Sequence, residues 1–376
     1  MSAAPTSARS KLFSPLMLRD LELPNRIMVG PMGQYSANEG SLGAWHLMHL
    51  GSLAVSGAGL VVIEATAVNP DGRLSPHDPG LWSDANEAAL KPILEFCREH
   101  GGARLGLQLF HSGRKGSVTV AWERQQAIPV ERGGWIPRAA SAIPYPNRTI
   151  PKVLDFAEMR QLADDYVAVT RRSDRLGIEL LELHSAHGYL LHNFLSPLTN
   201  RRADAYGGSL ENRMRFPLEI FKAVRDAWPE HKPLGARISA VDWADGGWTI
   251  EDSVAYAKAL KALGCDYITA SSGGAVAEQK VEVGPGYQVP FADVIRRETG
   301  LCTVAVGLIT EARQAEEILQ SGKADLVGLA RTMLYNPRWP WHAAVELGEE
   351  FYYPKQYERA HPSMQGGDFL RPARTV

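Results

Sequence analysis

The chain has 376 residues, and its 42 acidic and 40 basic residues leave a net charge of −2. A nearly neutral chain lacks the positive field that draws proteins to nucleic acid or to anionic membranes, so we expect neither partner. Hydrophobic residues make up 45% of the chain and charged residues 22%, which provides material for a core and excludes global disorder.

Cysteine usage and the start of the chain indicate a cytoplasmic protein. The cysteines, Cys97, Cys265 and Cys302, lie too far apart for a disulfide framework, a CxxC zinc site or a four-thiolate iron–sulfur cluster. Residues 1–11 lack the hydrophobic segment of a secretory signal. The longest apolar stretch, residues 53–63, is far shorter than the roughly 18 residues of a membrane span.

Short, nearly continuous apolar stretches alternate with longer amphipathic ones. The former predict strands at residues 26–32, 60–66, 105–110, 178–184, 234–239, 267–271, 303–306 and 326–329. The latter predict helices at residues 46–56, 84–100, 156–176, 210–228, 250–263, 290–298, 311–321 and 337–347, with Asp84 as the expected cap of the second. Strand–helix units in succession predict a parallel α/β sheet, and eight of them close a (β/α)8 TIM barrel.

The alternative architecture is an open, doubly wound sheet. Its dinucleotide-binding form carries G-x-G-x-x-G after an early strand, and neither this string nor a P-loop nor a G-x-S-x-G turn occurs here. We therefore expect residues 1–376 to form a single TIM-barrel domain with a core at about 12–350. Residues 116–151 are expected to be a long loop excursion after the third strand, and residues 352–376 a C-terminal extension outside the barrel.

Reactive groups of TIM barrels lie at the carboxyl ends of the strands, and the fourth strand ends in a cluster of such groups. His184, His187 and Tyr189 follow one another there. Neutral imidazoles can donate hydrogen bonds to a substrate oxygen on which charge develops, and a phenol can deliver a proton. Two alternatives stay open: one histidine is an ordinary packed residue, or His111, His184 and His187 bind a metal ion in a hydrolase or lyase.

The first, third and fifth strands indicate a flat, polar ligand. Small residues near 30–33 let such a ligand approach the backbone beside Tyr35, unless this is an ordinary turn. Gln108 needs polar company inside an apolar strand. Arg237 lies within a strand as well, and it needs either an anion or a structural carboxylate, because an unpaired charge is costly there.

Residues 305–310 and 328–331 follow the seventh and eighth strands, where TIM barrels commonly bind phosphate. A phosphate at this place, together with Gln108 and Arg237, predicts a phosphorylated flat cofactor, for which flavin mononucleotide (FMN) fits best. Pyridoxal phosphate would need a lysine at a strand end, and the predicted strand cores contain none.

Several segments of the chain resemble those of a known family, the Old Yellow Enzyme flavoproteins. The resemblance is carried by NRIMVGPM at residues 25–32, EATAV at 64–68, QLFHSGRK at 108–115, HSAHGY at 184–189 and FLSPLTNRRADAYGGSLENR at 194–213. It is collinear from about residue 12 to residue 359. The HxxH spacing and QYER at 356–359 resemble the xenobiotic-reductase, or thermophilic-like, branch of ene-reductases.

The resemblance implies a barrel that holds FMN without a covalent bond. Its isoalloxazine ring would be lined by Gly30, Pro31, Met32, Gly33, Ala65, Gln108 and Arg237, and its phosphate by Val306, Gly307, Ala330 and Arg331. His184 and His187 would bind the substrate's carbonyl oxygen, Tyr189 would donate the proton, and Tyr35 would contact the substrate. Arg359 would reach into the substrate pocket of a neighbouring subunit, which implies a homodimer or a dimer-based homo-oligomer.

The implied activity is that of an ene-reductase. NADPH or NADH reduces FMN, hydride passes to the C=C bond of an α,β-unsaturated carbonyl or nitro compound, and the α-carbon is protonated. Alternatives are the same flavoenzyme running as a ketone desaturase, a flavin store without catalysis, and the metal-dependent hydrolase or lyase named above. We expect residues 116–151 to set substrate selectivity.

One position departs from the family pattern. The branch usually has cysteine where this chain has Gly33, and that thiol touches the flavin. We expect Gly33 to enlarge the pocket and relax substrate orientation without abolishing turnover.

Overall fold

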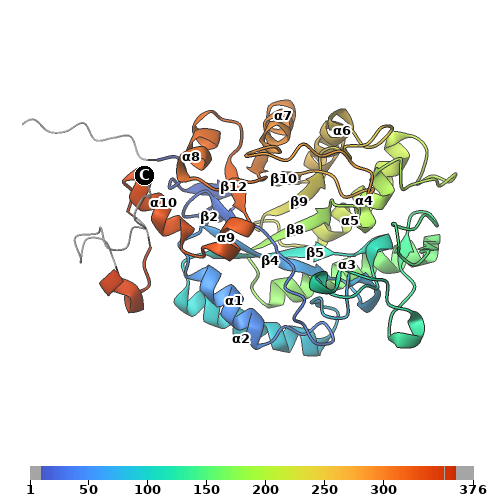
Figure 1. Ribbon diagram of the computed structural model, residues 1–376, viewed down its shortest axis with the longest axis horizontal. Coiled ribbons are helices and arrows are strands. Elements are labelled where there is room, and N and C mark those ends of the chain that lie inside the picture. The colour runs from blue at the N-terminus through green and yellow to red at the C-terminus, as the bar shows by residue number, and fades with distance from the viewer. Residues whose placement is uncertain (1–9, 351, 361–376) are drawn as a thin grey trace, which may run out of the picture.

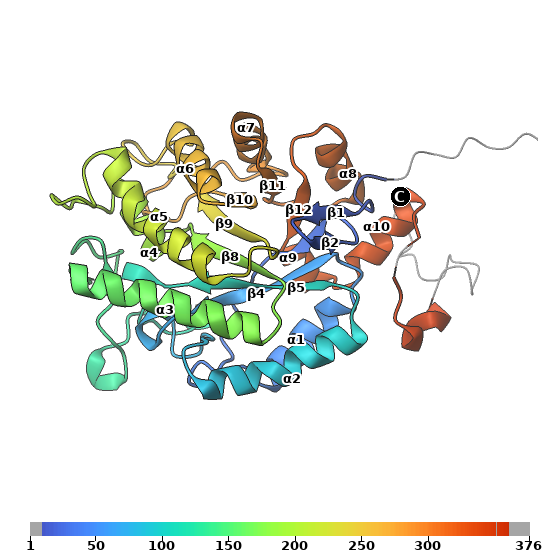
Figure 2. The same cartoon turned by 180° about the vertical axis from the view of Figure 1, so that it is seen from behind.

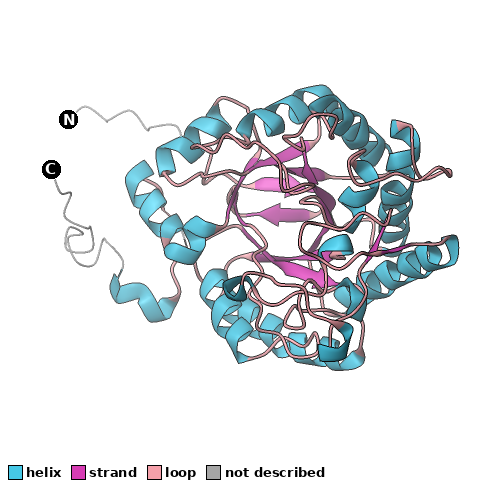
Figure 3. Cartoon of the chain, turned by 45° about the vertical axis from the view of Figure 1, so that its right-hand side comes forward, coloured by secondary structure: helices cyan, strands magenta, loops and turns pink. Residues whose placement is uncertain are grey.

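The computed structural model describes residues 10–350 and 352–360. Its centre is a closed barrel of eight parallel strands, as Figures 1 and 3 show. In chain order these are β3 (Ile27–Val29), β4 (Leu60–Ala67), β5 (Arg104–Phe110), β8 (Leu180–Ser185), β9 (Leu234–Ser239), β10 (Tyr267–Ser271), β11 (Cys302–Ala305) and β12 (Leu326–Leu329). The barrel closes where β12 pairs with β3, so the predicted (β/α)8 TIM barrel is confirmed.

Helices surround the strands, as the ring in Figure 3 shows. They are α1 (Ala44–Ala54), α2 (Asp84–His100), α3 (Phe156–Arg175), α5 (Leu210–Ala227), α6 (Ile250–Ala262), α7 (Val289–Thr299), α8 (Ala312–Gln320) and α10 (Trp339–Leu347). Each predicted helix is present with small shifts of its ends. The expected cap of α2, Asp84, is wrong. Ser83 keeps an extended backbone and accepts a hydrogen bond from the Asn86 N–H at 3.2 Å, so the helix begins one residue after it.

Several short elements were not predicted from the sequence, because they span too few residues to show a hydrophobic period. They are the antiparallel β1 (Leu16–Leu18) and β2 (Leu21–Leu23), α4 (Leu190–Leu195), α9 (Arg331–Tyr335), and the strand pair β6 (Arg138–Ala139) and β7 (Lys152–Val153). The 3-10 turns are η1 (Pro70–Gly72), η2 (Gly113–Lys115), η3 (Ala121–Glu123), η4 (Val130–Arg132) and η5 (Lys355–Ala360). Turns η3 and η4 and strand β6 lie in residues 116–151, between β5 and α3.

The first strand is shorter than predicted. It ends at Val29 instead of residue 32, because Gly30 and Pro31 break the ladder. The predicted flavin-side residues 30–33 therefore lie in the loop at the carboxyl end of β3, where a ligand can reach their backbone.

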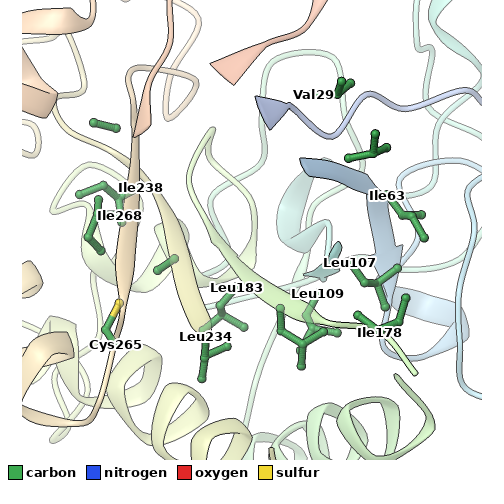
Figure 4. Close-up of a cluster of buried hydrophobic side chains, with 14 of the residues drawn as sticks. Val29, Ile63, Leu107, Leu109, Ile178, Leu183, Leu234, Ile238, Cys265 and Ile268 are labelled. Atoms are coloured by element: carbon green, nitrogen blue, oxygen red, sulfur yellow. The ribbon is translucent and has the colours of Figure 1, made fainter. Parts of the chain in front are cut away.

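Side chains alternate between the outside and the inside of the barrel along each strand. On the outside, Leu107, Leu183 and Ile268 belong to a continuous buried cluster that packs against the helices, part of which Figure 4 shows. On the inside, the amino end of the barrel holds a second apolar cluster that includes Leu60 and Leu180.

The β1–β2 hairpin closes the amino end. Its Leu18 and Leu23 pack into that inner apolar cluster, and Figure 2 shows the two strands beside β12. Tyr267 also fills this end. A Cβ atom on Gly235 of the neighbouring β9 would come within 2.3 Å of the Tyr267 ring, so that position requires glycine. No helix in the described part of the chain is long and apolar enough to cross a membrane.

Candidate active site

A cavity of about 260 Å³ opens at the carboxyl ends of the strands. Of the residues predicted to bind cofactor or substrate, it is lined by Gly30, Pro31, His187, Arg237, Val306, Gly307, Ala330 and Arg331. These come from both ends of the chain and from β9, so barrel closure brings the predicted ring-binding and phosphate-binding segments into one site.

The remaining predicted residues lie outside this lining. Tyr35, Ala65 and Tyr189 pack together against a small buried cluster around Phe110. Gln108 is buried inside the barrel. The others are His184, buried next to Tyr189; Met32, partly buried against the main core; Gly33, exposed beside Tyr35; and Arg359, exposed in η5.

A belt of polar side chains crosses the inside of the barrel below the cavity. The Gln108 amide donates to one carboxylate oxygen of Glu182 at 2.8 Å, and the Thr269 hydroxyl donates to the other at 2.5 Å. Sequence reasoning missed Glu182 and Thr269 as site residues. Strand alternation could have found them, because Glu182 is two residues before His184 and Thr269 is paired with Arg237 across the ladder.

Arg237 projects from β9 into the cavity. Burial lowers its pKa, while Glu182 acts in the opposite direction. Its Nε has no hydrogen-bond partner among the described residues. The two oxygens of Glu182 accept hydrogen bonds from Gln108 and Thr269, and Glu182 forms no ion pair with Arg237, so this carboxylate leaves the Nε of Arg237 unsatisfied. A partly unsatisfied arginine facing a cavity is suited to an anion or to the acceptor edge of a polar ring.

The phosphate-binding corner is made of backbone that approaches closely. Gly307 has a φ of 108°, and a Cβ there would lie 3.0 Å from the Gln288 amide nitrogen. A Cβ on Gly328 would lie 2.7 Å from Val306. Both glycines are therefore required by space, and they leave a cradle next to the cationic Arg331 that fits a phosphate group.

The predicted histidine–tyrosine group is brought together. The ring centroid of His184 lies 5.1 Å from that of His187 and 5.0 Å from that of Tyr189. The Ala186 N–H donates to Nδ1 of His184 at 3.2 Å, so the neutral His184 ring carries its proton on Nε2. Nε2 of His187 lies 2.7 Å from the Ser271 hydroxyl. The same hydroxyl lies 3.3 Å from Oε1 of Gln288, to which it can donate. When it donates to the imidazole instead, Nδ1 becomes the N–H donor of His187.

Burial sets the protonation of this group. It is the largest cause of the lowered pKa of His184 and of His187, and the charge of Arg237 lowers both further. Burial likewise raises the pKa of Tyr189. At neutral pH the two imidazoles are therefore neutral hydrogen-bond donors, and the phenol keeps the proton that it could deliver.

The loop after β8 is held in one conformation. His187 has a φ of 58°, in the left-handed region, and its backbone N–H donates to Ser239 at 2.9 Å. The ammonium group of Lys115 donates to its carbonyl oxygen at 2.8 Å. Two residues that sequence reasoning missed, Lys115 and Ser271, thus position His187. Period-two alternation points to Ser271, and the position of Lys115 after β5 was the only signal for it.

A buried contact between a histidine and a carboxylate supports the same loop. Nε2 of His192 lies 3.0 Å from Asp242, and Nδ1 of His192 accepts a hydrogen bond from the Gly188 N–H at 2.9 Å. Burial alone would raise the pKa of Asp242, but His192 and hydrogen bonds from Ser196 and Trp248 lower it. The histidine is consequently a structural partner of the carboxylate.

The metal-site alternative is wrong on geometry. Nowhere in residues 10–350 and 352–360 do three or more His, Cys, Asp or Glu side chains form a group that could hold a metal ion. Nδ1 of His111 accepts a hydrogen bond from the Gly113 N–H at 3.0 Å. Burial, and then the charge of Arg138, lower the pKa of His111 to about 3. His111 is therefore a neutral, packed residue.

Comparisons with known proteins agree with this geometry. Residues 11–350 match the NADH:flavin oxidoreductase / NADH oxidase family. An NADPH dehydrogenase of Geobacillus sp. (strain WCH70) is 46% identical over 93% of this chain and 98% of its own. The NADPH dehydrogenase of Bacillus subtilis (strain 168) is 39% identical over 93% and 98%.

Solved structures are similar as well. Morphinone reductase superposes with a TM-score of 0.77 at 26% identity, covering 97% of this chain and 100% of its own. The complex of morphinone reductase with tetrahydroNAD gives a TM-score of 0.75 at 28% identity, covering 97% and 98%. The chain therefore belongs to the FMN-dependent NADH:flavin oxidoreductase / NADH oxidase family and is an oxidoreductase that uses FMN and NAD(P)H.

Proposed function

We propose that this enzyme is an ene-reductase that reduces the C=C bond of α,β-unsaturated carbonyl or nitro compounds. The observation that carries the proposal is the group of two neutral imidazoles and one protonated phenol at the carboxyl end of β8. A relative that bears the name morphinone reductase supports a ketone-bearing substrate class.

The donor set fits FMN. Arg237, with a free Nε–H, and Gln108 would face the polar edge of the ring, and the loop Gly30–Gly33 with Ala65 would lie along it. The cradle of Val306, Gly307, Ala330 and Arg331 would hold the phosphate. When bound, FMN supplies the hydride that NAD(P)H has delivered to it.

The chain's own residues then handle charge and the proton. Negative charge develops on the substrate's carbonyl or nitro oxygen as the alkene is reduced. His184 through Nε2–H and His187 through Nδ1–H donate hydrogen bonds that strengthen with this charge, which is how such donors lower a barrier. Tyr189, kept protonated by burial, delivers its proton to the α-carbon. Tyr35, which packs against the same small cluster as Tyr189, contacts the substrate as well.

The double variant His184→Ala/His187→Ala tests this assignment. Anaerobic stopped-flow with NADPH and then cyclohexenone separates the two half-reactions. We expect alkene reduction to fall by about 10²-fold or more, since removing one such donor already costs on the order of 10²-fold, while flavin reduction changes far less. The exposed His231→Ala is the matched control. Equal losses in both half-reactions would contradict the proposal.

We also propose a cytoplasmic enzyme that forms a homodimer or a dimer-based homo-oligomer, in which Arg359 contacts a neighbouring subunit. Arg359 is exposed in η5, next to the half-exposed Tyr357. Light scattering after size exclusion tests the assembly, and Arg359→Ala is expected to raise KM for cyclohexenone. A monomer with full activity would contradict this assignment.

A further inference from the structure

Residues 116–151 place the guanidinium of Arg148 near Tyr35, the residue expected to contact the substrate. This segment is the blue-green part at the right of Figure 1. Arg148 donates to the Gln125 side-chain oxygen at 3.3 Å, and the Gln125 amide donates to the Tyr35 hydroxyl at 3.2 Å. Trp122 packs edge-on against the Tyr35 ring, with ring centroids 5.8 Å apart. The excursion is thus tied to a wall of the substrate pocket.

A second cation reaches the same place from the barrel. Lys115 is the last residue of η2, the 3-10 turn after β5. Its Nζ lies 4.4 Å from the ring centroid of Tyr145 and 5.5 Å from that of Tyr189. The backbone N–H of Arg148 donates to the carbonyl oxygen of Tyr145 at 3.0 Å. Tyr145 therefore links the two cations, and Lys115 lies against the proposed proton donor.

Neither cation has a counter-ion among the described residues. In the described part of the chain no carboxylate forms an ion pair with Lys115 or Arg148, and Nη1 of Arg148 is buried without a hydrogen-bond partner. Burial, and then the charges of Arg114 and Arg148, lower the pKa of Lys115 to about 7. Burial also lowers the pKa of Arg148, and only tyrosines act against that. An unpaired, partly buried guanidinium is costly, and an anion between these groups would relieve that cost.

We propose that Arg148 and Lys115 form a subsite for a carboxylate carried by the reducible substrate, which makes unsaturated oxo acids the preferred substrate class. This rests on the proposed ene-reductase function. The carboxylate only binds here: the alkene gains the hydride and the proton, and the carboxylate keeps all of its atoms.

The place of the subsite favours a substrate carboxylate over a dinucleotide phosphate. Lys115 lies one side chain away from Tyr189, so a carboxylate a few bonds from the alkene can reach both. A dinucleotide places a ribose between its reactive ring and its first phosphate. Two donors of different kinds, a guanidinium fork and an ammonium, also match the two oxygens of one carboxylate.

The test compares β-acetylacrylate with its methyl ester, which differ in the negative charge. The measured quantity is the ratio of their kcat/KM values within each variant, so any general effect of a substitution cancels. In Arg148→Met we expect the acid-to-ester ratio to fall by at least about tenfold, as for a lost hydrogen bond to a charged group. Arg148→Lys should retain part of the preference. Arg132→Met, an exposed arginine on the same excursion, should retain all of it.

An unchanged ratio in Arg148→Met overturns the proposal. So does an unchanged ratio with a weaker Kd for NADPH in flavin reduction, because it would assign the cations to the dinucleotide. Failure of the proposed function is distinguishable: the wild type would then reduce its flavin with NADPH but neither alkene. In that case the Kd of the saturated acid levulinate, measured from flavin absorbance, still tests the subsite, and equal values in wild type and Arg148→Met overturn it.

Discussion

The two ends of the barrel are built from the same strands but serve opposite purposes. At the amino end the inward side chains are apolar, such as Leu60 and Leu180, and the hairpin residues Leu18 and Leu23 seal them from water. Toward the carboxyl end the inward positions become polar. Along β8 alone, Leu180 is followed two and four residues later by Glu182 and His184, all fully or almost fully buried.

This contrast separates stability from chemistry. Apolar burial at the amino end contributes directly to the free energy of unfolding. Buried polar groups at the carboxyl end contribute little or oppose folding unless they are hydrogen-bonded, yet they hold the donors that the reaction uses. Substitutions at one end should therefore change stability with little effect on rate, and substitutions at the other end should do the reverse.

Tyr189→Phe should have the largest effect at the carboxyl end. The phenylalanine ring can keep the contacts with Phe110 and His184, whose ring centroids lie 4.7 and 5.0 Å away. Without a proton donor, alkene reduction should fall by about 10²-fold or more, while the thermal midpoint stays unchanged. Single-turnover re-oxidation of the flavin by cyclohexenone measures the first and calorimetry the second. A large loss of stability with full activity would reverse the assignment.

Leu23→Ala should have the largest effect at the amino end. The side chain is fully buried between the hairpin and the barrel. Its truncation should lower the free energy of unfolding by about 2–5 kcal/mol and leave kcat of the folded enzyme unchanged. Denaturant unfolding of FMN-saturated protein measures it. Met17→Ala, 56% exposed on the same hairpin, is the control with an expected change below about 0.5 kcal/mol. Equal destabilisation by Leu23→Ala and Met17→Ala would contradict the conclusion that buried hairpin side chains close the amino end of the barrel.

Lys115 should give the carboxyl end a pH-dependent stability. Its pKa falls from an ordinary value of 10.5 to about 7 because burial, then Arg114 and Arg148, disfavour the charge. Between these pH values the unfolded chain binds more protons than the folded one, so this residue makes the free energy of unfolding rise with pH. Relative to Lys115→Met, the wild type should gain stability from pH 7 to pH 10. Parallel curves for the two proteins would contradict the shift.

Ser271→Ala should have a smaller effect on rate. The Ser271 hydroxyl lies 2.7 Å from Nε2 of His187 and is proposed to select its Nδ1–H form. Its removal should lower alkene reduction by about tenfold, the scale of one hydrogen bond, and Ser271→Thr should restore it. Absence of rescue by threonine would show that the side chain acts through packing.

Gly33→Cys should have the smallest effect. A Cβ at Gly33 would lie 3.6 Å from the Tyr35 ring, which is ordinary contact, and the backbone there is not in the left-handed region. The variant should fold normally. It should give a product of higher enantiomeric excess, because the added side chain fixes the substrate against Tyr35. Chiral chromatography of products and a flavin redox titration measure it. Unchanged potential, rate and stereochemistry would contradict a role for this glycine in substrate orientation.

Much of the fold was predictable because its signals are local. Continuous apolar strands and amphipathic helices follow each other regularly, and the barrel follows from their number. The β1–β2 hairpin was not predictable, since three-residue strands show no period. The end of β3 was misplaced because Gly30 and Pro31 continue an apolar stretch while they end the ladder.

The candidate site divides in the same way. His184, His187 and Tyr189 were found because they lie within six residues of chain at the carboxyl end of one strand. Glu182 was not, because its importance lies in its partners: Gln108 is 74 positions away and Thr269 is 87 positions away. Likewise, Gln125 meets Tyr35 across 90 positions.

The sequence by itself determined the barrel, its strand order and the reactive side chains at the carboxyl ends, because strand and helix periods and strand ends are properties of neighbouring residues. The tertiary structure decided which of those side chains meet, which stay neutral and which remain unpaired. Protonation depends on burial and on charges from other strands. For example, burial and then the charge of Arg237 lower the pKa of His184. Only closure of the barrel creates that burial, and only the folded excursion brings Arg148 to Tyr35 through Gln125.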